Sequence, residues 1–119
     1  MIPGHVTLAV EQSSYGQTDT ITATVANGLG GDIRVADHQS GCTIVAVERL
    51  TGAAWALQHP CPLRSPTRLI ALAAGSVTAA AIPPPVGAWA TGAYRLTLNY
   101  RPAEADDVTT LTSAQFTVA

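Results

Sequence analysis

The two cysteines, Cys42 and Cys61, are the residues of this chain best suited to do chemistry, because a pair of thiols can form a disulfide or help to bind a metal ion. The sequence between them reads as two short strand-like runs separated by Thr51-Gly52, which is typical of a β-hairpin. A hairpin brings its two ends together, so the pattern predicts a Cys42–Cys61 disulfide. Disulfides persist in oxidising compartments, and we therefore expect an extracytoplasmic location: secreted, periplasmic or at the cell surface.

Two free thiols, or half of a metal site, are the alternatives to this disulfide. His59 lies close to Cys61 in the sequence. However, one cysteine, a histidine across Pro60 and a distant second cysteine do not match a zinc-binding pattern. We expect no metal and no cofactor.

Catalytic patterns are also missing from the sequence. No Gly-x-Ser-x-Gly turn is present, and the serines and histidines occur in ordinary loop or edge contexts. The acidic group in the predicted last turn lacks the calcium-loop motif and reads as a solvated loop. The acidic group comprises Glu104, Asp106 and Asp107. We therefore expect the protein not to be an enzyme.

The composition narrows the class of protein further. The chain has 119 residues, enough for a single domain over 1–119, and 12% of them are charged, against about 25% in an average domain. All six basic residues are scattered arginines and the net charge is −2, which argues against nucleic-acid binding. No stretch has the length and apolarity of a transmembrane helix. The first residues do not resemble a signal peptide, so an exported protein of this sequence would be a trimmed chain or one domain of a longer one.

Short runs with period-two alternation, separated by glycine and proline, predict strands throughout the chain. The clearest is 94–101, where Tyr94, Leu96 and Leu98 share one face. In the last run Leu111 has the opposite parity to Phe116, which predicts a bulge near Ser113. The pattern favours an all-β, antiparallel sandwich of seven or eight strands. The expected strands are 5–12, 19–27, 33–36, 42–50, 54–59, 76–82, 94–101 and 108–118.

The register of the cysteine hairpin has two candidates. A tight turn at Thr51-Gly52 would place Glu48 beside Trp55, whereas a bulged turn at Gly52 would pair Val47 with Trp55. Because the second register collects the apolar side chains on one face, we favour it. It predicts that Trp55 lies in the core, as do Tyr94 and Phe116.

Two loops are candidates for contact with a partner. The proline-stiffened segment 62–68 carries Arg64 and Arg68, which read either as a solvated crossing or as a recognition loop for an acidic partner. Trp89 follows Pro83-Pro84-Pro85 in a loop, where a tryptophan either plugs the end of the sandwich or anchors a partner. The possible interaction surface is therefore Arg64, Arg68 and Trp89.

Three segments resemble those of bacterial immunoglobulin-like sandwich domains. Thr91-Gly-Ala-Tyr94-Arg-Leu96 resembles the Gly-x-Tyr-x-Cys opening of strand F, with Leu96 in the place of the cysteine, and the resemblance implies a tyrosine corner at Tyr94. Ala74-Gly-Ser-Val77 resembles the entry to the preceding strand. Glu48 to Trp55 resembles a strand–Gly–x–x–Trp hairpin, an order that also occurs in the bacterial intracellular proteinase inhibitor (BsuPI-like) family.

These observations lead to two functional expectations. The first is a non-catalytic, extracytoplasmic accessory or protein-interaction domain of a bacterial envelope or secreted protein, whose partner is another protein or a neighbouring domain. The alternative is a proteinase inhibitor that acts through an exposed loop at 60–66. Members of the inhibitor family need no disulfide, and no inhibitory-loop motif transfers to this chain. We also expect weak self-association through one of the terminal strands, 5–12 or 108–118.

Overall fold

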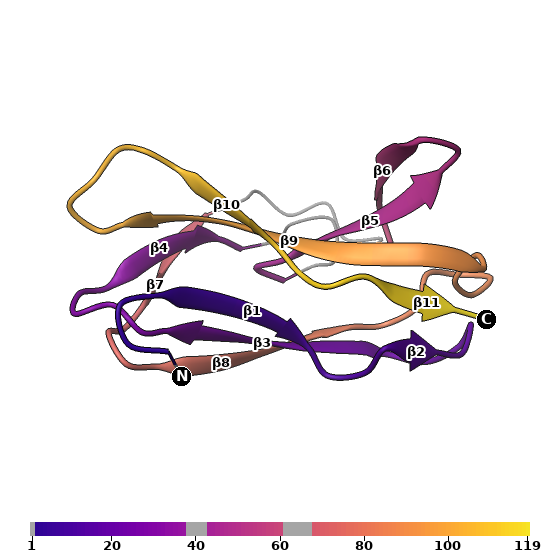
Figure 1. Cartoon of the computed structure of the whole chain (residues 1–119), viewed down its shortest axis with the longest axis horizontal. Coiled ribbons are helices and arrows are strands. Elements are labelled where there is room, and N and C mark those ends of the chain that lie inside the picture. The colour runs from indigo at the N-terminus through magenta and orange to yellow at the C-terminus, as the bar shows by residue number, and fades with distance from the viewer. Residues whose placement is uncertain (1, 38–42, 61–67) are drawn as a thin grey trace.

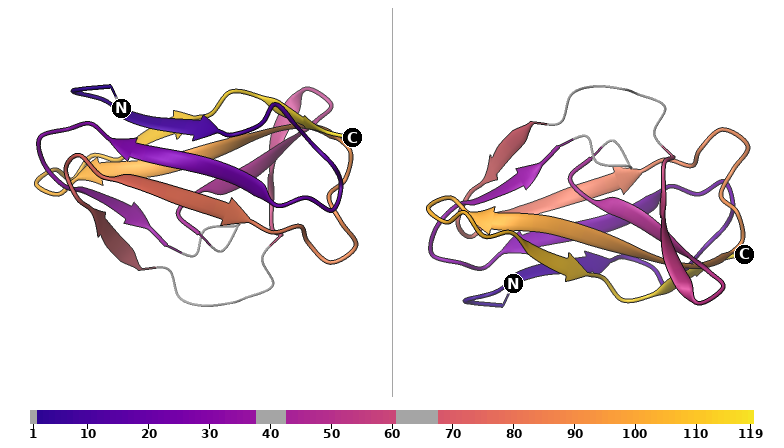
Figure 2. Two further views of the ribbon diagram at one scale, coloured as in Figure 1. Left: turned by 90° about the horizontal axis from the view of Figure 1, so that it is seen from below. Right: turned by 90° about the horizontal axis from the view of Figure 1, so that it is seen from above.

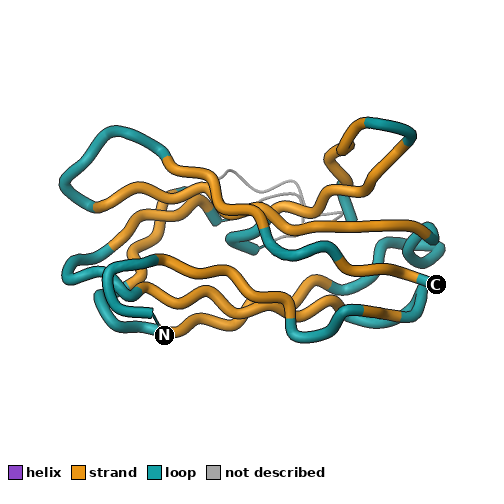
Figure 3. Tube along the Cα trace, viewed as in Figure 1, coloured by secondary structure: helices purple, strands orange, loops and turns teal. Residues whose placement is uncertain are grey.

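The computed structural model describes residues 2–37, 43–60 and 68–119, and its described part contains strands and no helix (Figures 1 and 3). The strands form two sheets in two layers, which confirms the predicted all-β, sandwich-like class. Cys42, Cys61 and Arg64 lie outside the described residues, and so does the predicted disulfide.

Eleven strands occur in the described part of the chain, more than the seven or eight expected. Two of the additional strands are short pieces without a clear alternating pattern. Another arises because the last predicted strand is divided in two. The strands are β1 Val6–Val10, β2 Ser14–Tyr15, β3 Ile21–Asn27, β4 Ile33–Ala36, β5 Ala46–Thr51, β6 Ala54–Gln58, β7 Leu69–Leu72, β8 Val77–Ile82, β9 Gly92–Pro102, β10 Thr109–Thr112 and β11 Phe116–Val118.

The smaller sheet has the order β1-β3-β8, and all its pairs are antiparallel. β3 lies in the centre, and its inward side chains Ile21, Ala23 and Val25 are buried, as the alternation predicts. On β8, the small side chains Ala79 and Ala81 stand on the outer face.

The larger sheet is organised around β9 (Figure 2). β4 and β5 pair with opposite halves of the same edge of β9, while β10 and β11 share its other edge. β7 flanks β4 and β6 flanks β5, so the sheet continues for one strand beyond them. The prediction of a wholly antiparallel fold needs one correction, because β2 pairs with β11 in parallel.

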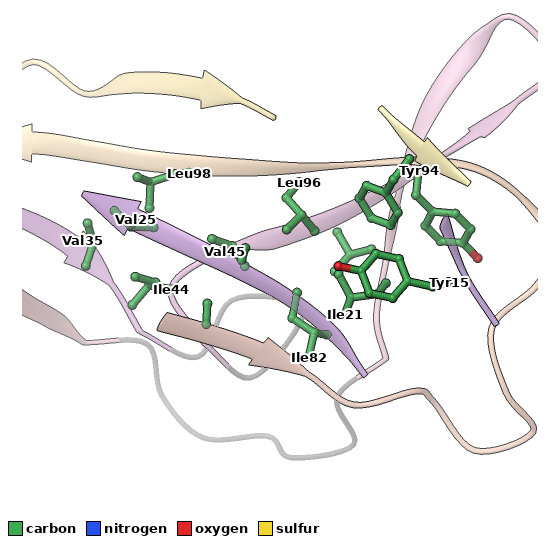
Figure 4. Packing of buried hydrophobic residues seen from close by; sticks show 14 of the residues in the cluster. Tyr15, Ile21, Val25, Val35, Ile44, Val45, Ile82, Tyr94, Leu96 and Leu98 are labelled. Atoms are coloured by element: carbon green, nitrogen blue, oxygen red, sulfur yellow. The ribbon is translucent and has the colours of Figure 1, made fainter. Parts of the chain in front are cut away.

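The core lies between the two sheets and is one continuous cluster of buried side chains. Figure 4 shows Leu96 and Leu98 of β9 pointing toward Ile21 and Val25 of β3. At one end three aromatic rings continue the core: Tyr15 meets Phe116 edge to face at 5.5 Å, and Phe116 stacks on Tyr94 at 5.9 Å. Tyr94 and Phe116 are thus core residues, as predicted.

A bulge is predicted near Ser113; the register along β9 does shift by one residue there, and the strand is interrupted. β10 ends at Thr112 and β11 begins at Phe116, and both pair with β9. Between them, the hydroxyl of Ser113 accepts a hydrogen bond from the Leu96 amide at 2.9 Å, and the Ser113 amide donates to the Leu96 carbonyl at 2.9 Å. Ser113 therefore satisfies the backbone of β9 at the break while the chain changes parity.

The β5–β6 hairpin has neither of the two registers considered from the sequence. Thr51 pairs with Ala54 and Leu50 pairs with Trp55, so the two-residue turn is Gly52-Ala53. Gly52 has φ 64°, and a positive φ at the first central residue is what a type II′ turn requires. Trp55 consequently stands on the face that also carries Glu48, and the prediction of a core position for Trp55 is wrong.

Candidate interaction surface

The hairpin places apolar side chains on the outer face of the larger sheet. Trp55 is half-buried there, and Leu57 is 50% exposed. Leu50 lies opposite Trp55, and Glu48 lies opposite Leu57 on the same face. Figure 1 shows that β5 and β6 rise away from the body of the sandwich.

Arg95 of β9 explains why the hairpin adopts this arrangement. Arg95 lies opposite Glu48 in the pairing of β9 with β5, and the two side chains form an ion pair with 2.6 Å between Arg95 Nε and Glu48 Oε1. The same guanidinium lies over the Trp55 ring, 4.4 Å from its centroid. A guanidinium can both pair with a carboxylate and stack on an aromatic face. Arg95 therefore stabilises Glu48 and Trp55 in their outward positions. We name Glu48, Leu50, Trp55, Leu57 and Arg95 the hairpin patch.

Trp89 is only 2% exposed, so its ring does not offer a face to a partner. The indole Nε1 donates to the Asp19 carbonyl at 2.8 Å, and the ring meets Tyr94 edge to face at 5.8 Å. Gln17 accepts a hydrogen bond from the Trp89 amide through its carbonyl and donates to the Trp89 carbonyl through its side chain. These contacts fit the plug alternative and correct the assignment of Trp89 to the interaction surface.

Arg68 is exposed, with 74% of its side chain accessible, and it lies just before β7. Its Nε is 3.7 Å from Asp37 Oδ2. Because Trp89 is internal, the structure does not combine Arg68 and Trp89 into one exposed surface. Arg64 lies outside the described residues.

The loop that leads into β9 is held from two sides. The Tyr94 hydroxyl donates to the Ala90 carbonyl at 2.7 Å, and the Arg49 guanidinium donates to the Thr91 carbonyl at 2.8 and 3.2 Å. A Cβ on Gly92, which has φ 145°, would lie 3.3 Å from Arg49 Nε. Burial raises the pKa of the Tyr94 phenol, and the positive charge of Arg49 partly opposes this shift. The Tyr94 hydroxyl therefore keeps its proton at neutral pH and can donate this hydrogen bond.

A hollow of about 190 Å³ opens beside this loop, between the end of β6 and the segment that follows β8. Its lining includes His59, Pro60, Trp89 and Tyr94. Ala88, also in the lining, has φ 77°, a left-handed conformation that costs a non-glycine residue energy.

A second, smaller hollow of about 100 Å³ lies on the outer face at the other end of the larger sheet. Arg34 and Arg101 line it, together with exposed Leu69 and Val108. No local pattern in the sequence indicates this site, because its residues come from four separate strands or their ends. By contrast, the outward position of Arg95 follows directly from the alternation in 94–101.

No group of three potential metal ligands occurs among the residues that the structure describes. Within that same part, no helix is long and apolar enough to span a membrane. No protein-family model matches the chain, and the search of curated proteins finds no match either.

Proposed function

We propose that the chain is an immunoglobulin-like sandwich domain. Two features support this assignment. The central strand β9 lies between β4/β5 and β10/β11, as strand F lies between strands C and G in such domains. Tyr94 also makes the hydrogen bond of a tyrosine corner, to a carbonyl four residues upstream.

We propose that this domain is a non-catalytic protein-interaction or accessory module and that the hairpin patch is its contact surface. The observation that carries the proposal is the outward position of Trp55, which is held by Arg95 and flanked by exposed Leu57. Tryptophan and arginine are the residues most enriched among those that dominate binding energy at protein interfaces. A partner would cover Leu57 and the remaining open part of the Trp55 ring.

The partner expected for this patch is a folded protein with an apolar contact area and charged groups at its rim. The rim charges would meet Glu48 and Arg95, whose side chains remain 21% and 28% exposed. Such a partner is either a separate protein or a neighbouring domain of a longer chain. Interfaces of this kind combine an apolar centre with a polar border.

The test is site-specific photo-crosslinking in the cells that make the protein. A photoreactive amino acid replaces Leu57 in one variant and Thr22, on the outer face of the smaller sheet, in the control variant. We expect a discrete adduct to one protein only from position 57, and we expect Trp55→Ala to reduce it at least tenfold. Equal labelling from both positions, or no adduct from position 57, would contradict the proposal.

The proposed extracytoplasmic location rests on the two cysteines and is tested separately. Protein purified without reductant is alkylated and weighed by mass spectrometry. We expect no free thiol, because the pair is expected to be oxidised outside the cytoplasm. Two alkylated cysteines in freshly isolated protein would remove the basis for this location and leave the hairpin patch unaffected. The proteinase-inhibitor alternative depends on 60–66, of which only Pro60 lies in the described part.

A further inference from the structure

Two arginines lie directly opposite each other on the outer face of the larger sheet. Arg34 of β4 pairs with Arg101 of β9 in the antiparallel register. Like charges in directly opposed positions destabilise a sheet, so this pair is unfavourable in the isolated domain. Neither arginine makes an ion pair within the described part of the chain, although Arg101 Nη1 donates to the Ala105 carbonyl at 2.9 Å.

Exposed apolar side chains line the same hollow as the two arginines. Leu69 at the start of β7 is 52% exposed, and Val108 just before β10 is 62% exposed. Between them, the small side chain of Ala36 forms the floor of a depression in the sheet surface. The resulting hollow of about 100 Å³ is somewhat smaller than the ~150 Å³ engineered cavity that binds benzene. It has room for a branched aliphatic group of the size of a leucine side chain.

We infer that this hollow is a binding site for a carboxylate attached to a small apolar group. A carboxylate between Arg34 and Arg101 accepts charge-assisted hydrogen bonds and relieves the repulsion between them. The apolar group then covers Leu69 and Val108. Such a ligand is the C-terminus of a chain that ends in an apolar residue, or a free acid with the same chemistry. The site uses none of the residues of the hairpin patch, so it stands independently of the proposed function.

The test is an NMR titration of the isotopically labelled full chain with three ligands. The first is an acetylated tetrapeptide, Gly-Ser-Gly-Leu, with a free carboxyl end; the second is the same peptide with an amidated end; the third is N-acetyl-leucine. We expect saturable shifts at the Arg34 and Arg101 side chains and at the Val108 amide with the free peptide, and at least tenfold weaker binding of the amide. Comparable binding of N-acetyl-leucine identifies a free acid as sufficient, and weaker binding identifies a chain end.

Two charge-reversal variants separate binding from folding. Arg34→Glu replaces a repulsive cross-strand pair with an attractive one, so we expect an unchanged or higher melting temperature together with at least tenfold weaker binding. Arg68→Glu changes the net charge equally at an exposed site outside the hollow, and we expect it to bind as the wild type does. The inference is overturned by the absence of saturable shifts at millimolar ligand, by equal binding of the amide, or by full binding in Arg34→Glu.

Discussion

Tyr94 shows how one hydroxyl group fixes a loop against a strand. Its hydrogen bond to the Ala90 carbonyl closes the turn that enters β9, and its ring lies between Trp89 and Phe116. We expect Tyr94→Phe to keep the ring packing and to lower the free energy of unfolding by about 1 kcal/mol, because only the hydrogen bond is lost. Urea denaturation measures the change. The matched control is Tyr100→Phe, since the Tyr100 hydroxyl has no hydrogen bond in the described part. A loss equal to that of Tyr94→Phe would contradict this role.

The same hydroxyl gives a prediction about alkaline pH. Burial raises the pKa of Tyr94 above its ordinary value of 10.0, so the folded state holds this proton more tightly than the unfolded state. The stabilisation is complete below the unfolded pKa and is lost as the pH rises above it. We expect the free energy of unfolding to fall more steeply above about pH 10 in the wild type than in Tyr94→Phe. Identical pH profiles for the two proteins would show that Tyr94 is not responsible.

At the scale of single elements, the β5–β6 hairpin depends on the conformation of Gly52. An alanine at φ 64° meets a steric cost that glycine avoids, so we expect Gly52→Ala to destabilise the hairpin by about 1 kcal/mol. Faster amide exchange at Ala54 and Ala56, which stand at the hydrogen-bonded positions of the hairpin, would report it. Gly30→Ala is the control, because a Cβ there has open space and Gly30 has no positive φ. If both variants exchange alike, the turn does not have this geometry.

The elements differ in how far the sequence predicts them. Where apolar residues alternate without interruption, as in 94–101, the pattern predicts both the strand and its inward face. The change of parity also predicts a bulge near Ser113, where the structure shifts the register by one residue and interrupts the strand. β2 and β7 escape prediction because they are short and owe their pairing to β11 and β4.

The hairpin register could not be predicted because its deciding contact is not local. Grouping the apolar side chains on one face of the hairpin places Trp55 in the core. Arg95 lies forty residues further along the chain and provides both the charge for Glu48 and the surface for the indole ring. A similar limit applies to the Arg34 and Arg101 pair, whose two members become neighbours only when β4 pairs with β9.

In the whole molecule, the two terminal strands differ in whether an edge is free to pair with a second copy of the chain. β11 is covered by β9 on one side and β2 on the other, so its part of 108–118 is not an open edge. β1, in contrast, ends the order of the smaller sheet. We expect weak self-association through β1, visible by sedimentation velocity at millimolar concentration, and its loss in Ala9→Lys. Ala103→Lys, on the loop after β9, is the control; a strictly monomeric wild type would refute this prediction.

The hairpin patch exists only if Trp55 points outward, because only this register brings its side chains together. Its most direct test is the pattern of NMR cross-strand nuclear Overhauser effects in the hairpin. The structure predicts contacts between the backbones of Leu50 and Trp55, and between the Trp55 ring and the Arg95 side chain. Backbone contacts between Val47 and Trp55, with the ring close to core residues such as Leu96, would contradict it.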